Sequence, residues 1–462
     1  MFAGRLAPVT RPQFRSAHEL LDAYRFDEVS PVEVIDATLR SISDSTINAF
    51  WRVDADRAAS AARYAEDAYR RGTPRPLEGV PIGVKDIIDT AGMTTTSGSS
   101  MFADRVPDAD ADVVQALRDA GAIIVGKTAT HEFAYGVTTV NPRYGTTHHP
   151  SSPGHIVGGS SGGSAAAVTD GLVPLALGSD TSVSIREPSA FCGCVGLRPT
   201  HDSISLRGVT PLAPSFDAVG PMATTADDAS LMAEVLWTRS PGLAGPPAIL
   251  DATVEFSPLR IAYMIEGWPL TPIPAILDAV QLAANALRNL GHRLVPVIVD
   301  EFRSCADTFT NAMLPESLEV HRRMGLWPER HAEYGADVSV RLRAAEAITL
   351  EVHLGALADR RILRERMNEF FRSFDILLTP TTAITAPTIE NRDTPEYDGR
   401  LYPLRDLLFP FQVTAPLCGL PALALPIGRS SSGLPTSVML TAAPRQDRQL
   451  LQLGSQLMKE LT

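Results

Sequence analysis

The stretch Gly158-Gly-Ser160-Ser161-Gly162-Gly163-Ser164 decides the interpretation of this chain, together with Gly79-Val-Pro-Ile-Gly-Val-Lys85-Asp86 before it and Gly178-Ser-Asp180-Thr-Ser182-Val-Ser184-Ile-Arg186 after it. Each stretch places one chemically active side chain among small residues, which let the backbone approach a bound group closely. Taken alone, the glycine–serine stretch is typical of a flexible loop, and it matches neither of the glycine patterns that bind phosphate. The three stretches become informative through their order along the chain.

Lysine can supply the base that a serine nucleophile needs. A serine hydroxyl reacts poorly near neutral pH unless a base lies within hydrogen-bond reach. None of the ten histidines pairs with a Gly-x-Ser-x-Gly turn between a strand and a helix. Lys85 lies among Val80, Ile82, Val84 and Ile87, and burial among apolar groups lowers the pKa of a lysine. A lone lysine in an apolar run is more often a surface residue. Lys85 therefore indicates a catalytic base only in combination with the two serine stretches.

The three stretches, in this order, resemble the amidase signature family, whose serine hydrolases use a Ser–Ser–Lys triad. Further landmarks extend the resemblance over nearly the whole chain: Gly126-Lys127-Thr128 and residues 193–200, 211–222, 378–380, 419–422 and 433–435. The resemblance implies a cofactor-independent amidohydrolase without a metal. It agrees with the fold class that we expect, an α/β fold with a large, mixed, mostly parallel sheet covered by helices on both faces.

The resemblance also implies a role for each residue of the site. Lys85 takes a proton from Ser160, Ser160 takes one from Ser184, and a cis peptide bond joins Gly159 to Ser160. Ser184 then attacks a carbonyl carbon. The oxyanion hole consists of the backbone N–H groups of Thr181, Ser182, Val183 and Ser184. We expect Ser161, Asp180 and Arg186 to support the site, and His131 and Tyr135 to line the substrate pocket.

The chain departs from the family immediately before the nucleophile. Family members usually carry a glycine-containing pair there, whereas this chain has Ser182-Val183. A β-branched valine at positive φ would be a genuine outlier. We expect a negative φ at Val183, with the donors intact and a narrower pocket, and we expect the Ser182 hydroxyl to hydrogen-bond within the loop. In the alternative, the loop is displaced and hydrolysis of ordinary amides falls by several decades.

Strands and helices alternate along the rest of the chain, which favours an α/β fold. Ser30-Pro31 predicts a capped helix start, and an Ala-rich helix over 55–69 ends before Gly72. We expect one domain with four segments: a helical segment over 1–75, a catalytic core over 76–240, a βαβ unit and helical region over 254–374, and strands and a helix over 375–462. The expected elements are strands at 80–84, 122–125, 173–177, 193–197, 375–379, 421–426 and 437–440, helices at 111–120, 164–169 and from 447, a connection at 241–253, a βαβ unit over 259–299 and a helical region over 303–374.

Composition excludes several classes of function. The net charge of −12 argues against a nucleic-acid surface. Four cysteines are too few for a disulfide framework, so buried reduced thiols are expected, and His148-His149 lacks a third metal ligand. Neither a signal peptide nor an 18-residue apolar run is visible, which predicts a cytoplasmic protein without a membrane segment. The expected partner is a small-molecule substrate, and a homodimer is left open.

These observations favour an enzyme that cleaves a C–N bond beside a carbonyl, in an amide, carbamate or urea-like compound, through a Ser184 acyl-enzyme. Two alternatives remain. One is the amidase subunit of a tRNA-dependent amidotransferase, although His131 stands where we would expect an acidic residue in that subfamily. The other is a non-catalytic scaffold whose oxyanion loop is spoiled by Ser182-Val183.

Overall fold

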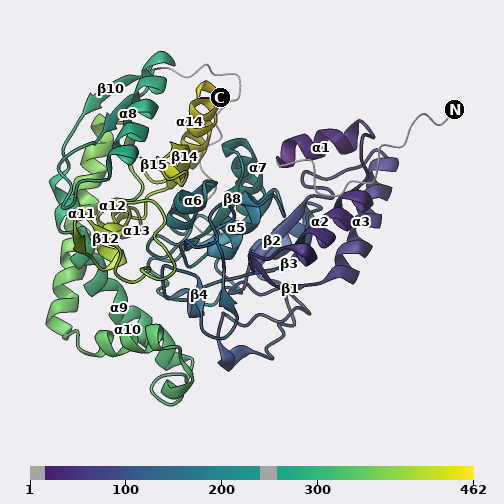
Figure 1. Cartoon of the computed structure of the whole chain (residues 1–462), viewed down its shortest axis with the longest axis horizontal. Helices are drawn as coiled ribbons and strands as arrows, with labels where there is room; N and C mark the ends of the chain where they lie inside the picture. The colour runs from purple at the N-terminus through teal and green to yellow at the C-terminus, as the bar shows by residue number, and fades with distance from the viewer. Residues whose placement is uncertain (1–15, 240–257, 462) are drawn as a thin grey trace.

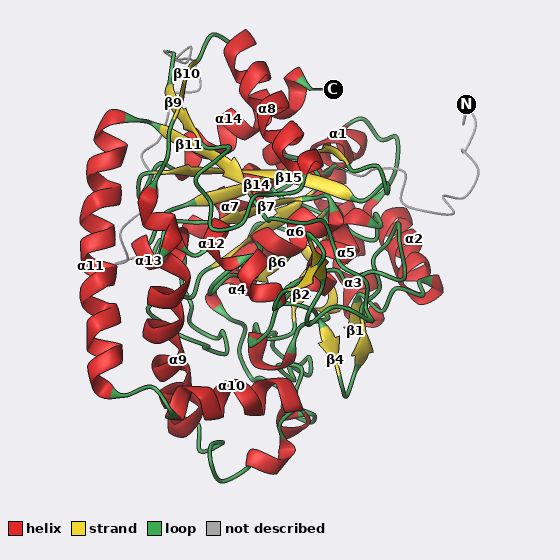
Figure 2. Cartoon of the chain, turned by 60° about the vertical axis from the view of Figure 1, so that its left-hand side comes forward, coloured by secondary structure: helices red, strands yellow, loops and turns green. Residues whose placement is uncertain are grey.

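In the computed structural model of the chain, residues 16–239 and 258–461 are described. Their central feature is one eleven-stranded sheet, shown in Figures 1 and 2. In chain order its strands are β1 (Phe50–Val53), β2 (Pro81–Lys85), β3 (Ile123–Thr128), β6 (Leu175–Ser179), β7 (Val195–Arg198), β8 (Val219–Ala223), β9 (Arg260–Tyr263), β10 (Arg293–Pro296), β11 (Ile376–Pro380), β14 (Ala422–Arg429) and β15 (Pro435–Ala442). In space their order is β1-β3-β2-β6-β8-β7-β14-β15-β11-β9-β10.

The sheet is mixed, as expected, but its parallel pairs are confined to the flanks. The pairs β3-β2, β2-β6, β11-β9 and β9-β10 are parallel, and the last of these confirms the expected βαβ unit. The pairs from β6 across to β11, and the edge pair β1-β3, are antiparallel. The sheet thus contains fewer parallel strand pairs than the alternation of strands and helices along the chain predicts. The reason is that a short turn joins β14 to β15 and that β8 is inserted between β6 and β7.

Helices cover both faces of this sheet, which confirms the expected α/β fold (Figure 2). Successive side chains of β3 show the two faces: Ile124 belongs to one apolar cluster, and Ile123 and Val125 belong to another. The helices of the first face are α4 (Asp112–Asp119), α7 (Ala226–Trp237), α8 (Pro274–Asn289) and α14 (Asp447–Glu460). Those of the second are α2 (Pro31–Asp44), α3 (Ala55–Arg70), α5 (Gly162–Thr169) and α6 (Arg186–Cys192).

A helical layer extends beyond the second face and confirms the helical region expected over 303–374. It is built from α9 (Cys305–Arg323), α10 (Ala336–Glu346), α11 (Leu350–Ser373), α12 (Phe409–Gln412) and α13 (Thr414–Cys418). Its apolar cluster includes Leu377 and Met439 of the sheet and also Val183, so this layer reaches the loop before Ser184. The remaining elements are α1 (Ala17–Arg25) and the short pairs β4 (Val140–Asn141) with β5 (Gly145–Thr146) and β12 (Glu396–Tyr397) with β13 (Arg400–Leu401).

Several local expectations can be compared directly with the structure. The four cysteines are free and buried, and Gly72 follows α3 at a φ of 70°. The expected connection over 241–253 lies outside the described residues. Among the described helices, none combines the length and the apolar character that crossing a bilayer requires.

The start of α2 is a capping box. The Glu33 backbone N–H donates to Ser30 Oγ over 3.1 Å, and the Ser30 N–H donates to the Glu33 carboxylate over 2.9 Å. Both donors would otherwise lack an intrahelical partner. The structure therefore confirms the helix start that Ser30-Pro31 predicts.

We predict that Ser30→Ala lowers the free energy of unfolding by about 0.5–2 kcal/mol, because it removes the acceptor for the Glu33 N–H. Ser41→Ala is the matched control in the same helix, since the Ser41 hydroxyl has no partner within the described residues. Urea denaturation followed by circular dichroism measures both variants. Equal losses in the two would show that the capping box does not stabilise the protein.

Candidate active site

The topology brings the three sequence stretches to one edge of the sheet. Strands β2 and β6 pair in parallel, so Lys85 and Ser179 end neighbouring strands on the same side. Ligands of α/β proteins generally bind at such carboxyl ends. Ser160 and Ser161 precede α5, and Ser184 precedes α6. The three stretches that the sequence singles out therefore converge in space.

Lys85 is fully buried, and its amine lies among three serine hydroxyls. The distance from Nζ to Oγ is 2.7 Å for Ser160 and 2.8 Å for both Ser161 and Ser179. Burial lowers the pKa of Lys85 well below its ordinary value, and the opposing charge of Asp180 only partly offsets this effect. Burial therefore favours the neutral amine, which is the form that a general base requires.

Proton accounting shows which hydroxyl the lone pair of Lys85 can face. The Ser161 hydroxyl donates to the Ser179 carbonyl over 3.0 Å and accepts the Ser179 N–H over 3.1 Å. Since its proton is engaged, Ser161 accepts from Lys85. A neutral amine has two N–H donors and one lone pair. If the donors serve Ser161 and Ser179, the lone pair is left for the proton of Ser160.

The Ser179 hydroxyl is a member of this group that the sequence did not single out. Its only signal was its place directly before Asp180 in the third stretch. The expected cis peptide bond between Gly159 and Ser160 is present. Ser184 is nearly buried, and its carbonyl accepts the Ser161 N–H over 3.2 Å. Within the described residues no hydrogen bond joins the hydroxyls of Ser160 and Ser184, so these two stretches meet through backbone.

The loop of residues 181–184 keeps its donors free. Within residues 16–239 and 258–461, none of its four backbone N–H groups has a protein acceptor. Val183 is not among the residues with positive φ, as expected, and its side chain is fully buried. The Ser182 hydroxyl does not confirm its expected role. It forms no hydrogen bond within the loop. Ser182 does contact Arg186, but with its backbone carbonyl oxygen.

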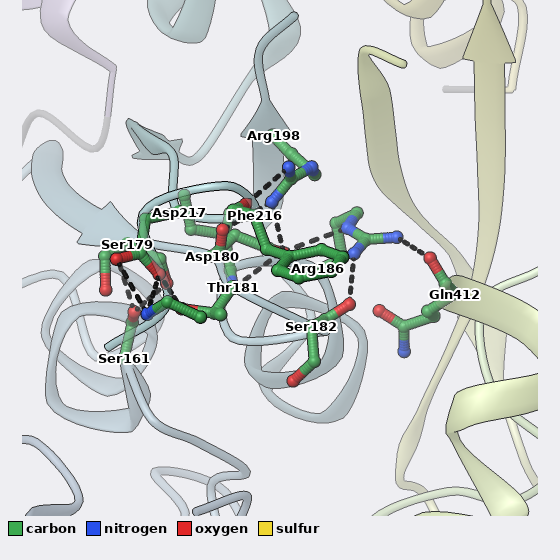
Figure 3. A network of polar contacts seen from close by, with 12 residues as sticks. Ser161, Ser179, Asp180, Thr181, Ser182, Arg186, Arg198, Phe216, Asp217 and Gln412 are labelled. Carbon is green, nitrogen blue, oxygen red and sulfur yellow. Dashed lines mark hydrogen bonds and ion pairs between the residues drawn. The ribbon is translucent and has the colours of Figure 1, made fainter. Parts of the chain in front are cut away.

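Buried charges anchor this loop, as Figure 3 shows. The Asp180 carboxylate accepts from the Ile185 N–H and from both Arg186 and Arg198 over 3.0–3.1 Å. Burial would raise the pKa of Asp180, but the two guanidinium groups hold it at about 2. Arg186 also donates to the Ser182 carbonyl over 2.6 Å. Asp180 and Arg186 thus have the supporting contacts that we expected.

Two further residues complete the anchor and were seen in the sequence only as landmarks. Arg198 donates to the Asp180 carbonyl oxygen and, over 2.7 Å, to that of Phe216. Asp217 accepts the Thr181 hydroxyl over 2.6 Å. Burial raises the pKa of Asp217, while the hydrogen bond from Thr181 opposes that rise. Both residues thus hold the start of the loop, Arg198 through Asp180 and Asp217 through Thr181 (Figure 3).

His131 and Tyr135 lie near the site, but their side chains have other partners. The His131 N–H donates to the Ser160 carbonyl over 3.3 Å. Its ring lines a cavity of about 280 Å³ at the start of α10, with Nε2 lying 3.4 Å from Asp337. The Tyr135 hydroxyl lies 2.7 Å from Ser317 Oγ in α9. A role of either residue in lining the substrate pocket stays a prediction.

Comparison with known proteins finds similarity over nearly the whole chain. Residues 33–451 match the sequence profile of the family described as Amidase. A glutamyl-tRNA(Gln) amidotransferase subunit from Prochlorococcus marinus (strain MIT 9303) is 35% identical over 93% of this chain and 94% of its own length.

Two solved structures are also similar to this chain. One is a chain from a vestigial protein complex that reveals the evolutionary origins of an s-triazine catabolic enzyme. It has a TM-score of 0.86 and 31% identity, and covers 96% of this chain and 98% of its own. The other is the corresponding glutamyl-tRNA(Gln) amidotransferase subunit from Thermotoga maritima, with a TM-score of 0.73 and 26% identity over 94% of this chain and 95% of its own.

We predict that Asp180→Asn lowers the free energy of unfolding by about 3–5 kcal/mol, because it leaves two buried guanidinium groups without a counter-charge. Asp202→Asn is the matched control, since that side chain is 58% exposed, and its effect should stay within about 0.5 kcal/mol. Urea denaturation at pH 7 measures both. Similar, small losses would mean that the ion pairs do not hold the loop.

Proposed function

Since this chain belongs to the amidase family and is therefore an amide-hydrolysing enzyme, we propose that it cleaves a small-molecule amide, carbamate or urea-like compound through a Ser184 acyl-enzyme. The buried amine of Lys85, 2.7 Å from Ser160 Oγ, carries this proposal. A neutral lysine in this position can do the work for which histidine is more commonly used.

In the proposed first half-reaction, Lys85 accepts the proton of Ser160 while Ser160 accepts the proton of Ser184. Ser184 Oγ bonds to the carbonyl carbon, and the electron pair of the C=O bond moves to its oxygen. The free N–H groups of residues 181–184 can stabilise that oxyanion, each worth about 2.7–4 kcal/mol. The C–N bond then breaks, and the leaving nitrogen takes the proton back from Lys85 through Ser160.

In the second half-reaction, water replaces the amine. Lys85 again draws a proton through Ser160, this time from the water, whose oxygen bonds to the acyl carbon. Collapse of the second oxyanion breaks the bond to Ser184 Oγ and releases the carboxylic acid, while Ser184 regains a proton through the same relay. No cofactor enters either half-reaction.

A second candidate is the amidase subunit of an amidotransferase, which the 35% identity to an amidotransferase subunit favours. The small-molecule proposal is supported by the structure of a 6-aminohexanoate cyclic dimer hydrolase, whose TM-score is 0.84 against 0.73 for the amidotransferase subunit. The two differ in what the isolated chain does. Hydrolysis of a panel of aryl and aliphatic amides, carbamates and esters would support the first. The second would be supported if the chain hydrolysed no compound of the panel and released ammonia from glutamine only after partner subunits and tRNA were added.

We predict that a fluorophosphonate probe labels the wild-type chain once, at Ser184, and that Ser184→Ala abolishes the labelling seen by intact mass. Lys85→Ala should slow labelling by several decades, because no other base contacts Ser160 within the described residues. Ser164→Ala is the control, since the Ser164 hydroxyl bonds to Thr128 and the Leu177 carbonyl instead. An unlabelled wild type would favour the scaffold alternative.

The pH profile provides a separate prediction. Burial lowers the pKa of Lys85, so its base form persists to a lower pH than that of an ordinary lysine and is lost as the pH falls further. We expect kcat/KM to fall about tenfold per pH unit below that pKa, which reports the essential base of the free enzyme. Circular dichroism at each pH separates this loss from unfolding. A profile that stays flat until the protein unfolds would remove Lys85 as the base.

A further inference from the structure

One buried side chain beside the oxyanion loop has hydrogen-bonding capacity that the protein does not use. Gln412, the last residue of α12, is fully buried, yet neither its carboxamide oxygen nor its nitrogen has a partner within the described residues. A carboxamide offers two N–H donors and one acceptor oxygen. Leaving them unpaired in the interior costs free energy, so such a group needs an explanation.

A carboxamide that serves the fold alone looks different in this protein. Asn141 is similarly buried, and its Nδ2 donates to the Gly98 carbonyl over 2.8 Å. Its Oδ1 accepts the N–H groups of Arg143 and Tyr144 over 2.9 and 3.0 Å. Asn141 is thus paired on both sides. Gln412 is not, which distinguishes it from a carboxamide placed to stabilise the chain.

Arg186 fixes the position of Gln412 relative to the nucleophile loop. Its Nη1 donates to the backbone carbonyl oxygen of Gln412 over 2.8 Å, and its Nη2 donates to the backbone carbonyl oxygen of Ser182 over 2.6 Å. Figure 3 shows the Gln412 side chain extending from α12 toward Ser182. The Ser182 hydroxyl also has no hydrogen bond within the described residues. At 8% exposure, Ser182 is the most accessible residue of the loop 181–184.

We propose that Gln412 and Ser182 form a polar subsite that recognises a second amide-type group of the substrate, a carboxamide or ureido group, beside the bond that is cleaved. This inference rests on the proposed function and names the substrate class. The Gln412 carboxamide presents a donor and an acceptor side by side, which match the C=O and N–H of such a group. Ser182 adds a hydroxyl where family members usually carry glycine.

Isosteric substrate pairs test this subsite with the full-length chain. Malonamide is compared with 3-methylbutanamide, and succinamide with 4-methylpentanamide, so that each pair differs only in one carboxamide replaced by an isopropyl group. We expect wild-type kcat/KM to favour the diamide at least about tenfold in one pair, because a site built for hydrogen bonds rejects an analogue that lacks them. Gln412→Met should reduce that preference at least about tenfold, and Ser182→Ala severalfold.

Thr414→Val is the matched control. The Thr414 hydroxyl is also buried, but it lies beside the Cys305 thiol and lines a small cavity with Thr379 and Met439. This variant should keep the wild-type preference. Should Gln412→Met fail to fold, Gln412→Glu keeps the shape of the side chain and removes both donors, and the same loss of preference is expected.

Fluorophosphonate labelling distinguishes a failure of the proposed function from a failure of the subsite. An unlabelled wild type would overturn the proposed function. A labelled wild type that shows no preference for either diamide, or that cleaves none of the four amides, would overturn the subsite alone. So would a labelled Gln412 variant that keeps the preference, or a Thr414→Val variant that loses it to the same extent.

Discussion

The desolvation of one amine is the constraint on which the site depends. An ammonium group in water would stay protonated at neutral pH, and only a dry interior makes the neutral form accessible. Around Lys85 the protein provides that interior without leaving the amine unpaired, because three hydroxyls contact it and none carries a charge. A carboxylate at the same distance would favour the protonated form. Asp180, the nearby acid, is instead occupied by two arginines.

The anchoring of the oxyanion loop follows from the same need for order in a dry interior. Backbone N–H groups can be left free for a ligand only if the loop is held by other atoms, and Asp180, Arg186 and Asp217 provide them. The support continues outward into the helical layer. Arg360 of α11 donates to the Ser215 carbonyl over 2.6 Å and lies 3.9 Å above the Phe216 ring. Residues 215–217, which support the loop, are thereby connected to the helical layer.

Local patterns predicted the parts of this structure that local chemistry determines. The helix start at Ser30-Pro31 followed from capping, and the strand predicted over 80–84, which forms as β2, followed from an apolar run. The resemblance to a family supplied the pairing of Lys85 with Ser160. Strand β1 was missed inside the segment predicted to be helical, because its pairing with β3 decides its structure. Strand β8 was missed because Gly220 and Pro221 disfavour strands and only its neighbours hold it in the sheet. The contacts of Ser179 and Gln412 were missed for a related reason, since hydrogen-bonding capacity left over after folding depends on three-dimensional neighbours.

The bond between Arg186 and the Gln412 carbonyl spans 226 positions of the chain. A nascent chain leaves the ribosome with its N-terminus first. The catalytic stretches therefore emerge long before α12, the helix that completes their support. Contacts between such distant segments form late because closing the intervening loop is entropically costly. A nascent or truncated chain that ends before α12 would therefore carry every triad residue and still lack the contact that Gln412 makes with Arg186.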